Sequence, residues 1–210
     1  MDQERDLKKD IEAFVPYNEQ EERDKELLLR YLSSGENVFI RENRGAHFSA
    51  SAWVVNHSRD KVLLAYHNIY DSWAWTGGHA DGEKDLLKVA VQEAMEETGI
   101  KTVKPVMENI FSLEVLTVDG HEKKGAYVSS HLHLNVTYLL QGDEREVLRK
   151  KEDENSDVGW FTIEECLDMV NETWMKERIY QKLAGKVLCV IQQEHSPEPE
   201  LKKNSRSGKW

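Results

Sequence analysis

The chain has 210 residues, which suits one domain with extensions or at most two small domains, and it is long enough to bury a core without disulfide bonds. Its 39 acidic and 28 basic side chains give a formal net charge of -11, which disfavours binding to extended nucleic acid. No apolar run approaches the roughly 18 residues of a membrane span, and the first residues lack the pattern of a secretory signal, so we expect a cytoplasmic protein that does not bind membranes. The two cysteines, Cys166 and Cys189, are more typical of packing thiols in a reducing compartment than of a disulfide.

Residues 1–45 are predicted to form a helical extension. Apolar residues keep helical spacing in two runs that Pro16 separates, and Asn18 can cap the second helix, which ends near Gly35. These apolar residues are Leu7, Ile11 and Phe14 in the first run and Leu27, Leu28, Tyr31 and Leu32 in the second. Because the segment gathers no convergent chemistry, we expect it to serve packing or a homodimer contact rather than catalysis.

From His47 onward the apolar pattern changes to the period of β-strands. Residues 48–55 and 61–66 read as two strands, and the turn residues 56–60 between them predict a hairpin. Residues 103–118, further along the chain, are also rich in strand-forming side chains.

Trp73 and Trp75 lie two residues apart, which places both rings on one side of a short strand that leads to Gly77. The rings can pack in the core, or they can form a face on which a flat group of a substrate stacks. Gly77 and Gly78 permit a tight backbone turn. His79, in the same turn, is either an ordinary loop residue or a contact to a phosphate group.

After this turn the sequence predicts a helix of about four turns that ends at Gly99, where a left-handed cap is expected. Three carboxylates fall together beside an apolar stripe; the stripe is Leu87, Ala90, Val91 and Ala94, and the carboxylates are Glu93, Glu96 and Glu97. Like charges at this spacing repel, and partial burial raises the cost, so a cation can lie between them. A solvated acidic helix face is the commoner explanation of this spacing by itself, and the Gly-Gly turn at a fixed distance before the helix is what favours the cation here. All-oxygen ligands with no cysteine nearby favour Mg²⁺ or Mn²⁺ over zinc.

The stretch from Gly77 to Ile100 resembles the box of the Nudix hydrolases, written G-x5-E-x7-R-E-U-x-E-E-x-G-U with U aliphatic. The residues that match it are Gly78, Glu93, Ala94, Glu96, Glu97, Gly99 and Ile100. Two positions depart from it: Gln92 stands where the family has an arginine that braces the glutamates, and Lys84 stands in the first glutamate position. Either Glu83 or Asp85 can do the capping work of that glutamate near the positive end of the helix.

A later predicted strand has a polar face with His131, His133, Asn135 and Thr137, and an apolar face with Leu132, Leu134, Val136, Tyr138 and Leu140. A solvated surface and a substrate cleft explain the polar face about equally well. A zinc site formed by His131 and His133 is a weaker interpretation because no third soft ligand is evident.

The C-terminal part begins with a charged loop over residues 142–157, from which a catalytic acid can come. A capping box at Thr162–Glu165 starts a helix, and a further helix is predicted over about residues 173–192, relaxed at Gly185. The tail, residues 194–210, is predicted to be loose.

The Nudix resemblance covers about residues 48–163 and implies an α/β (α+β) fold, in which a mixed β-sheet is sandwiched between helices. We therefore expect a domain over residues 46–193, preceded by the helical extension of residues 1–45 and followed by the tail of residues 194–210.

The resemblance also implies a Mg²⁺-dependent hydrolase that cleaves a diphosphate linkage in a nucleoside diphosphate derivative or a related small phosphate compound. The implied metal ligands are the Gly77 carbonyl, Glu93, Glu96 and Glu97, and the implied proton acceptor is Glu93 or Glu154. The candidate substrate contacts are Trp73, Trp75, His79, His131 and His133. The alternative, motivated by Gln92, is a catalytically weak module that senses a nucleotide or binds a protein.

Overall fold

The computed structural model describes residues 5–68, 71–123, 125–152 and 154–195. Its strands are β1 (Ala46–Val55), β2 (Lys61–His67), β3 (Ser72–Ala74), β4 (Thr76–His79), β5 (Val103–Pro105), β6 (Ser112–Val118), β7 (His121–Lys123), β8 (Ala126–Val128), β9 (His131–Gly142) and β10 (Asn155–Thr162). Its helices are α1 (Leu7–Ala13), α2 (Glu19–Leu32), α3 (Leu86–Thr98), α4 (Ile163–Met169), α5 (Thr173–Met175), the π-helical turn η1 (Lys176–Tyr180) and α6 (Gln181–His195).

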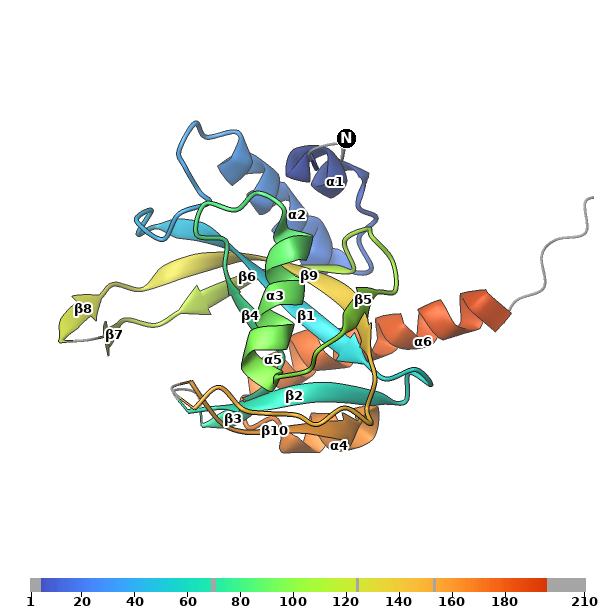
Figure 1. The fold of residues 1–210 in the computed structure, drawn as a ribbon. Coiled ribbons are helices and arrows are strands. Elements are labelled where there is room, and N and C mark those ends of the chain that lie inside the picture. The colour runs from blue at the N-terminus through green and yellow to red at the C-terminus, as the bar shows by residue number, and fades with distance from the viewer. Residues whose placement is uncertain (1–4, 69–70, 124, 153, 196–210) are drawn as a thin grey trace, which may run out of the picture.

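The centre of the fold is an 8-stranded mixed sheet with the strand order β10-β2-β1-β9-β5, on which β3, β4 and β6 pair with β2, β1 and β9 respectively. The two long central strands, β1 and β9, are parallel, from Ala46 opposite Leu132 to Val55 opposite Gln141. The predicted hairpin of β1 and β2 is confirmed, with Val55 opposite Val62. Strands β7 and β8 form a separate ribbon that extends from the sheet (Figure 1).

Helices cover both faces of the sheet, with α3 on one side and α6 on the other (Figure 1). The alternating side chains of β1 divide between two hydrophobic clusters: Phe48 and Ala50 pack with α1, α2 and α3, whereas Trp53 and Val55 pack with α4 and α6. The expected mixed sheet between helices is therefore confirmed.

The two predicted N-terminal helices are confirmed, and the side chain of Asn18 caps the second one by accepting a hydrogen bond from the Glu21 amide. Their apolar faces belong to the core of the chain itself, since Ile11 and Leu28 are fully buried against the sheet. Glu21 is also fully buried and pairs with Lys186 of α6 through Nζ–Oε1 and Nζ–Oε2 distances of 2.7 and 3.0 Å. The extension is thus joined to the sheet by apolar packing and to the C-terminal helix by charge.

The C-terminal helical region begins at Thr173 as predicted but differs in two details. The irregular turn is the π-helical segment Lys176–Tyr180, and Gly185 instead lies inside α6, where an added Cβ would meet the Tyr17 hydroxyl at 3.1 Å. Helix α6 continues to His195, past the predicted start of the tail, and residues 196–210 lie outside the described residues.

Both cysteines are free, and only Cys166 is a packing thiol, since Cys189 is exposed on α6. No helix among the described residues is both long enough and apolar enough to cross a membrane.

Candidate active site

Helix α3 is fixed at both ends by local residues. The side chain of Asp85 accepts hydrogen bonds from the amides of Leu87 and Lys88 at 3.2 and 3.3 Å, so an acid beside Lys84 does cap the helix. Gly99 ends the helix with a φ of 67°, which confirms the predicted left-handed cap.

The buried face of α3 is shifted by about one residue from the predicted stripe. Leu86, Val89, Ala90, Ala94, Glu97 and Thr98 are buried, whereas Leu87 and Val91 are only partly buried. This rotation separates the three carboxylates: Glu97 is 5% exposed, Glu93 is half-buried and Glu96 faces solvent. Only two of the three therefore enter the space between α3 and β4.

Glu97 is held by a hydrogen bond to each of its carboxylate oxygens. The amide of Gly77 donates to Oε1 at 2.8 Å, and the Asn155 side-chain amide donates to Oε2 at 3.1 Å. Burial nevertheless raises the pKa of Glu97 to about 7, with further contributions from the negative charges of Glu93 and Glu154, because the two hydrogen bonds offset only part of the desolvation.

Glu93 lies against the Gly-Gly turn. A Cβ added to Gly78 would lie 2.2 Å from Glu93 Oε1, so only glycine allows the carboxylate to approach the turn this closely. Burial also raises the pKa of Glu93, and the charge of Lys151 opposes this shift.

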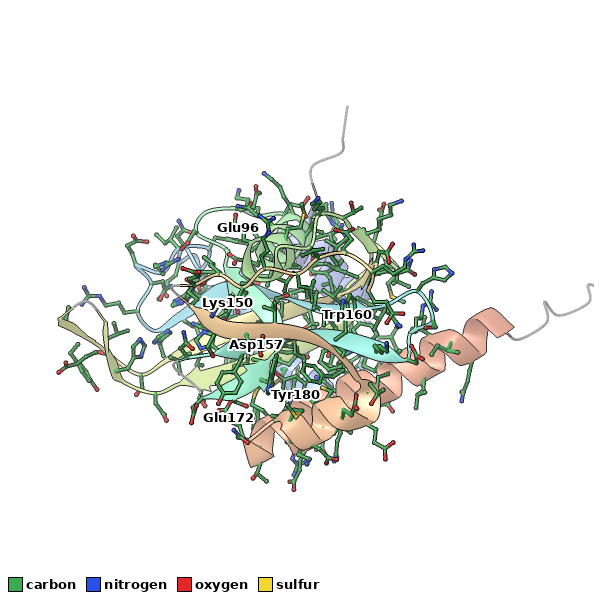
Figure 2. The ribbon with its side chains drawn as sticks, turned by 60° about the horizontal axis from the view of Figure 1, so that its bottom comes forward. Glu96, Lys150, Asp157, Trp160, Glu172 and Tyr180 are labelled. Atoms are coloured by element: carbon green, nitrogen blue, oxygen red, sulfur yellow. The ribbon has the colours of Figure 1, made fainter. Side chains whose placement is uncertain are left out.

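Glu96 and Gln92 form a pair on the exposed side of α3. Gln92 Nε2 donates to Glu96 Oε1 at 2.7 Å, so the residue in the arginine position of the box braces one glutamate through a neutral donor. Figure 2 shows Glu96 on α3, at the edge of the molecule.

Glu154, the predicted loop acid, precedes β10 and lies within electrostatic range of Glu93 and Glu97, since its charge raises the pKa of both. Its own carboxylate is exposed and pairs with Lys151 at 2.8 Å. Asn155, the residue beside it, was not identified from the sequence, because an asparagine at the start of a strand carries no distinctive spacing.

The donor set fits a hard divalent cation. Glu93 and Glu97 offer oxygen atoms, and their raised pKa values show that the surrounding protein does not fully compensate two ionised carboxylates. A bound dication would supply the missing positive charge.

A family model described as NUDIX domain matches residues 45–183, two thirds of the chain, and spans the Gly-Gly turn, α3 and β10. The chain belongs to the Nudix family. It is accordingly a Nudix-type pyrophosphohydrolase, an enzyme that acts on phosphorus-containing acid anhydrides.

Solved structures share this Nudix fold. One is a binary complex of an Ap4A hydrolase from C. elegans, with a TM-score of 0.50 and 18% identity over 70% of this chain and 98% of that chain. Another is the dihydroneopterin triphosphate pyrophosphohydrolase of E. coli, with a TM-score of 0.50 and 12% identity over 68% of this chain and 95% of that chain. At such identities the similarity shows the fold alone. A comparison with curated protein sequences finds no match.

The two tryptophans that precede the Nudix box pack on the α6 side of the sheet. The Trp73 ring meets Phe161 with centroids 4.5 Å apart, and the Trp75 ring lies 5.7 Å from that of Tyr180. Figure 2 places Tyr180 on the other side of β10 from Glu96. Both tryptophans are partly exposed, and a role in stacking on a substrate stays a prediction.

The polar face of β9 is buried over its middle part, so it is not the solvated surface considered from the sequence. Asn135 and Thr137 are buried and donate to the buried Glu114 carboxylate at 2.9 and 2.7 Å. Asn135 Oδ1 accepts from Ser49 and Ser51 of β1. The start of the same face brings the predicted His131 and His133 together with His79 and with His47, a residue to which the sequence assigned no role.

Proposed function

We propose that this pyrophosphohydrolase depends on Mg²⁺ and cleaves a diphosphate linkage in a nucleoside diphosphate derivative or a related small phosphate compound. The observation that carries the proposal is the pair formed by Glu93 and Glu97, two inward-facing carboxylates with raised pKa values at the Gly77–Gly78 turn. Such a pair is costly to the folded protein unless a cation joins it.

Glu93, Glu96, Glu97 and the Gly77 carbonyl would hold the ion, which is Mg²⁺ or Mn²⁺ by the oxygen-only donor set. When bound, such an ion neutralises charge on a diphosphate, orients it and acidifies a water molecule. Glu97 contributes a fixed position, because the Gly77 amide and Asn155 hold its two oxygens. Exposed Glu96 can rotate toward an ion from the rim.

Glu93 or Glu154 would accept the proton of the attacking water. Burial has moved the pKa of Glu93 upward, toward neutral pH, where a carboxylate is a more effective base. Glu154 is solvent-exposed and paired with Lys151, so its carboxylate can move between that lysine and the site.

The proposed substrate is a small molecule that contains a phosphoanhydride bond. The two similar solved structures are of an Ap4A hydrolase and a dihydroneopterin triphosphate pyrophosphohydrolase. Both names describe enzymes that act on a phosphoanhydride, and we propose the same kind of bond for this chain. His79, His131, His133, Trp73 and Trp75 are the proposed contacts to the rest of the substrate. A net charge of -11 disfavours extended nucleic acid as the substrate, and two free cysteines agree with a cytoplasmic location. A homodimer would have to use a surface other than the apolar faces of the helical extension, which pack in the core of the chain itself, and sedimentation tests for it.

The test is hydrolysis of a panel of nucleoside diphosphate derivatives with Mg²⁺, using added phosphatase to release phosphate from the monoester products. Glu97→Gln should abolish turnover, and Glu96→Gln should reduce it less, because Glu96 faces solvent. If Glu154 accepts the proton, Glu154→Gln should lower turnover more than Glu152→Gln, which changes an exposed acid in the same loop. Binding of panel members without metal-dependent turnover would instead support the catalytically weak sensing module.

A further inference from the structure

Four histidine rings from three strands meet beside the Nudix box. His47 is the second residue of β1, His79 is the last residue of β4, and His131 and His133 are the first and third residues of β9. Parallel pairing sets His47 opposite His133, and antiparallel pairing sets His79 opposite Ser49, two residues from His47. The ring centroids of His47 lie 5.1, 4.9 and 5.0 Å from those of His79, His131 and His133.

The ring nitrogens of three of these histidines also converge. His47, His79 and His133 each offer a nitrogen such that these three atoms lie within 4.8 Å of one another. His131 Nε2 lies 3.3 Å from His133 Nε2. Two nitrogens bound to one tetrahedral zinc ion, with bonds of about 2.0–2.1 Å, are separated by about 3.3 Å. The histidine pair on β9 already has this spacing.

Backbone carbonyls fix which nitrogen can bind a ligand in two of the rings. His47 Nδ1 lies 3.0 Å from the Asn43 carbonyl, and His131 Nδ1 lies 2.8 Å from the Ser129 carbonyl. A carbonyl oxygen only accepts, so each Nδ1 carries the proton and each neutral ring has its lone pair on Nε2. Metal-binding histidines are typically oriented by this kind of N–H···O=C bond.

His47 supplies a second and independent indication of a missing ligand. It is 3% exposed, and its Nε2 atom is buried without a hydrogen-bond partner. A buried acceptor left unsatisfied costs free energy, and such atoms are rare in folded proteins. A cation among the rings would satisfy it.

We propose that His47, His79 and His133 bind a transition-metal ion of the zinc class, with His131 as the fourth ligand. Nitrogen donors distinguish this site from the oxygen donors at Glu93 and Glu97, because imidazole suits Zn²⁺ and carboxylates suit Mg²⁺. The sequence offered only a histidine pair, and the pairing of three strands supplies the further ligands.

The ion would join the ends of β1, β4 and β9 next to the Nudix box. His79 is two residues from Gly77 on β4, about 7 Å along the strand. The neighbouring carboxylate of Asp81 pairs with Arg41 and also interacts electrostatically with His79 and His47, so a negative charge lies beside the four imidazoles. The zinc site would therefore hold the segment that follows the Gly77 and Gly78 turn, as a positioning site. With their ring nitrogens on the ion, His79, His131 and His133 would act on the substrate only through this positioning and not as the direct contacts proposed above.

The test uses the full chain, stripped of metal and then titrated with Zn²⁺ in excess Mg²⁺, which occupies the carboxylates. We expect one Zn²⁺ per chain by elemental analysis, and a Co²⁺ absorption spectrum of the intense tetrahedral type. His79→Asn and His133→Asn, at half-buried positions, should weaken Zn²⁺ binding by about 100-fold or more. The matched controls are His57→Asn, an exposed histidine outside the cluster, and Glu97→Gln, and both should keep full Zn²⁺ binding.

Circular dichroism establishes that each variant is folded. His47→Asn is a further variant at a buried position, and if it does not fold, His79→Asn and His133→Asn carry the test. Absence of stoichiometric Zn²⁺ binding by the wild-type chain would overturn the proposal, as would unchanged binding by His79→Asn. Loss of Zn²⁺ binding in Glu97→Gln would place the ion at the carboxylates and also overturn it. None of these readouts depends on hydrolysis, so the zinc site and the proposed Mg²⁺-dependent reaction can fail separately.

Discussion

Glu93 occupies the space that a side chain on Gly78 would need. A Cβ built on Gly78 would lie 2.2 Å from Glu93 Oε1 and 2.9 Å from its Cγ. The contact joins the opening glycine of the box to its first matching glutamate, although β4 and α3 are separate elements. The glycine is required here for close approach, since its φ does not lie in the left-handed region.

Gly78→Ala should therefore leave the protein folded and strongly reduce activity. The new methyl group displaces the Glu93 carboxylate, and a displacement of about 1 Å in an active site can cost about 100-fold in rate. The measurement is kcat/KM with Mg²⁺, together with a thermal melt. Gly45→Ala is the matched control, because its Cβ would meet only Asn43 Oδ1 at an ordinary 3.7 Å. Equal activity of the two variants would contradict the role given to Gly78.

Glu97 should make the metal-free protein less stable as pH rises. Its pKa is about 7 in the folded chain against an ordinary 4.5, so the folded state binds the proton more tightly than the unfolded state does. Below about pH 4.5 both states are protonated. Between the two pKa values Glu97 is ionised in the unfolded chain but still protonated in the folded chain, so the free energy of unfolding falls as pH rises. Above pH 7 this loss of stability is about 3 kcal/mol at most.

Urea unfolding of the metal-free wild type and of Glu97→Gln between pH 4.5 and 8 measures this effect. The glutamine does not ionise, and Asn155 Oδ1, a buried acceptor without a partner, can receive its amide after the Asn155 side chain flips. The stability difference should grow with pH in favour of the variant and shrink when Mg²⁺ is added to the wild type. A difference that stays constant over this pH range would show that Glu97 ionises normally.

Gln92→Arg should lower the Mg²⁺ concentration needed for activity by about threefold or more. The neutral hydrogen bond from Gln92 to Glu96 becomes a charge-assisted one, which is roughly twice as strong and orients the glutamate better. The measurement is activity against Mg²⁺ concentration, with Gln92→Lys as the control that adds charge without the planar fork. An unchanged or weaker Mg²⁺ dependence for the arginine variant would show that Glu96 needs no brace in this chain.

Lys186→Met should destabilise the protein by about 3–5 kcal/mol, because it leaves the buried Glu21 without its closest charged partner. Lys88→Met removes an exposed pair with Glu83 and should cost no more than about 1 kcal/mol. Denaturant unfolding of both variants tests the contrast. If their costs are similar, the joint between α2 and α6 does not depend on this ion pair.

The sequence predicts the elements whose signals are local. Helix α3, its Gly99 cap and the β1–β2 hairpin follow from spacing and turn chemistry within a few residues, whereas the N-terminal cap stayed a choice between Glu83 and Asp85 that the structure decides for Asp85. The irregular turn in the C-terminal helical region was placed at Gly185 but lies at Lys176–Tyr180, because glycine propensity is a weaker influence than the packing around a helix.

The sequence by itself determined the carboxylates, the glycine turn and the family, since these depend on residue types at fixed short spacing. Only the tertiary structure decided which acids are buried, because the rotation of α3 against β4 turns Glu97 inward and Glu96 outward. The same holds for Asn155 at Glu97 and for His47 at His133, which meet through strand pairing between distant parts of the chain. Local spacing carries no information about such pairings, because they form only when the sheet assembles around a shared core.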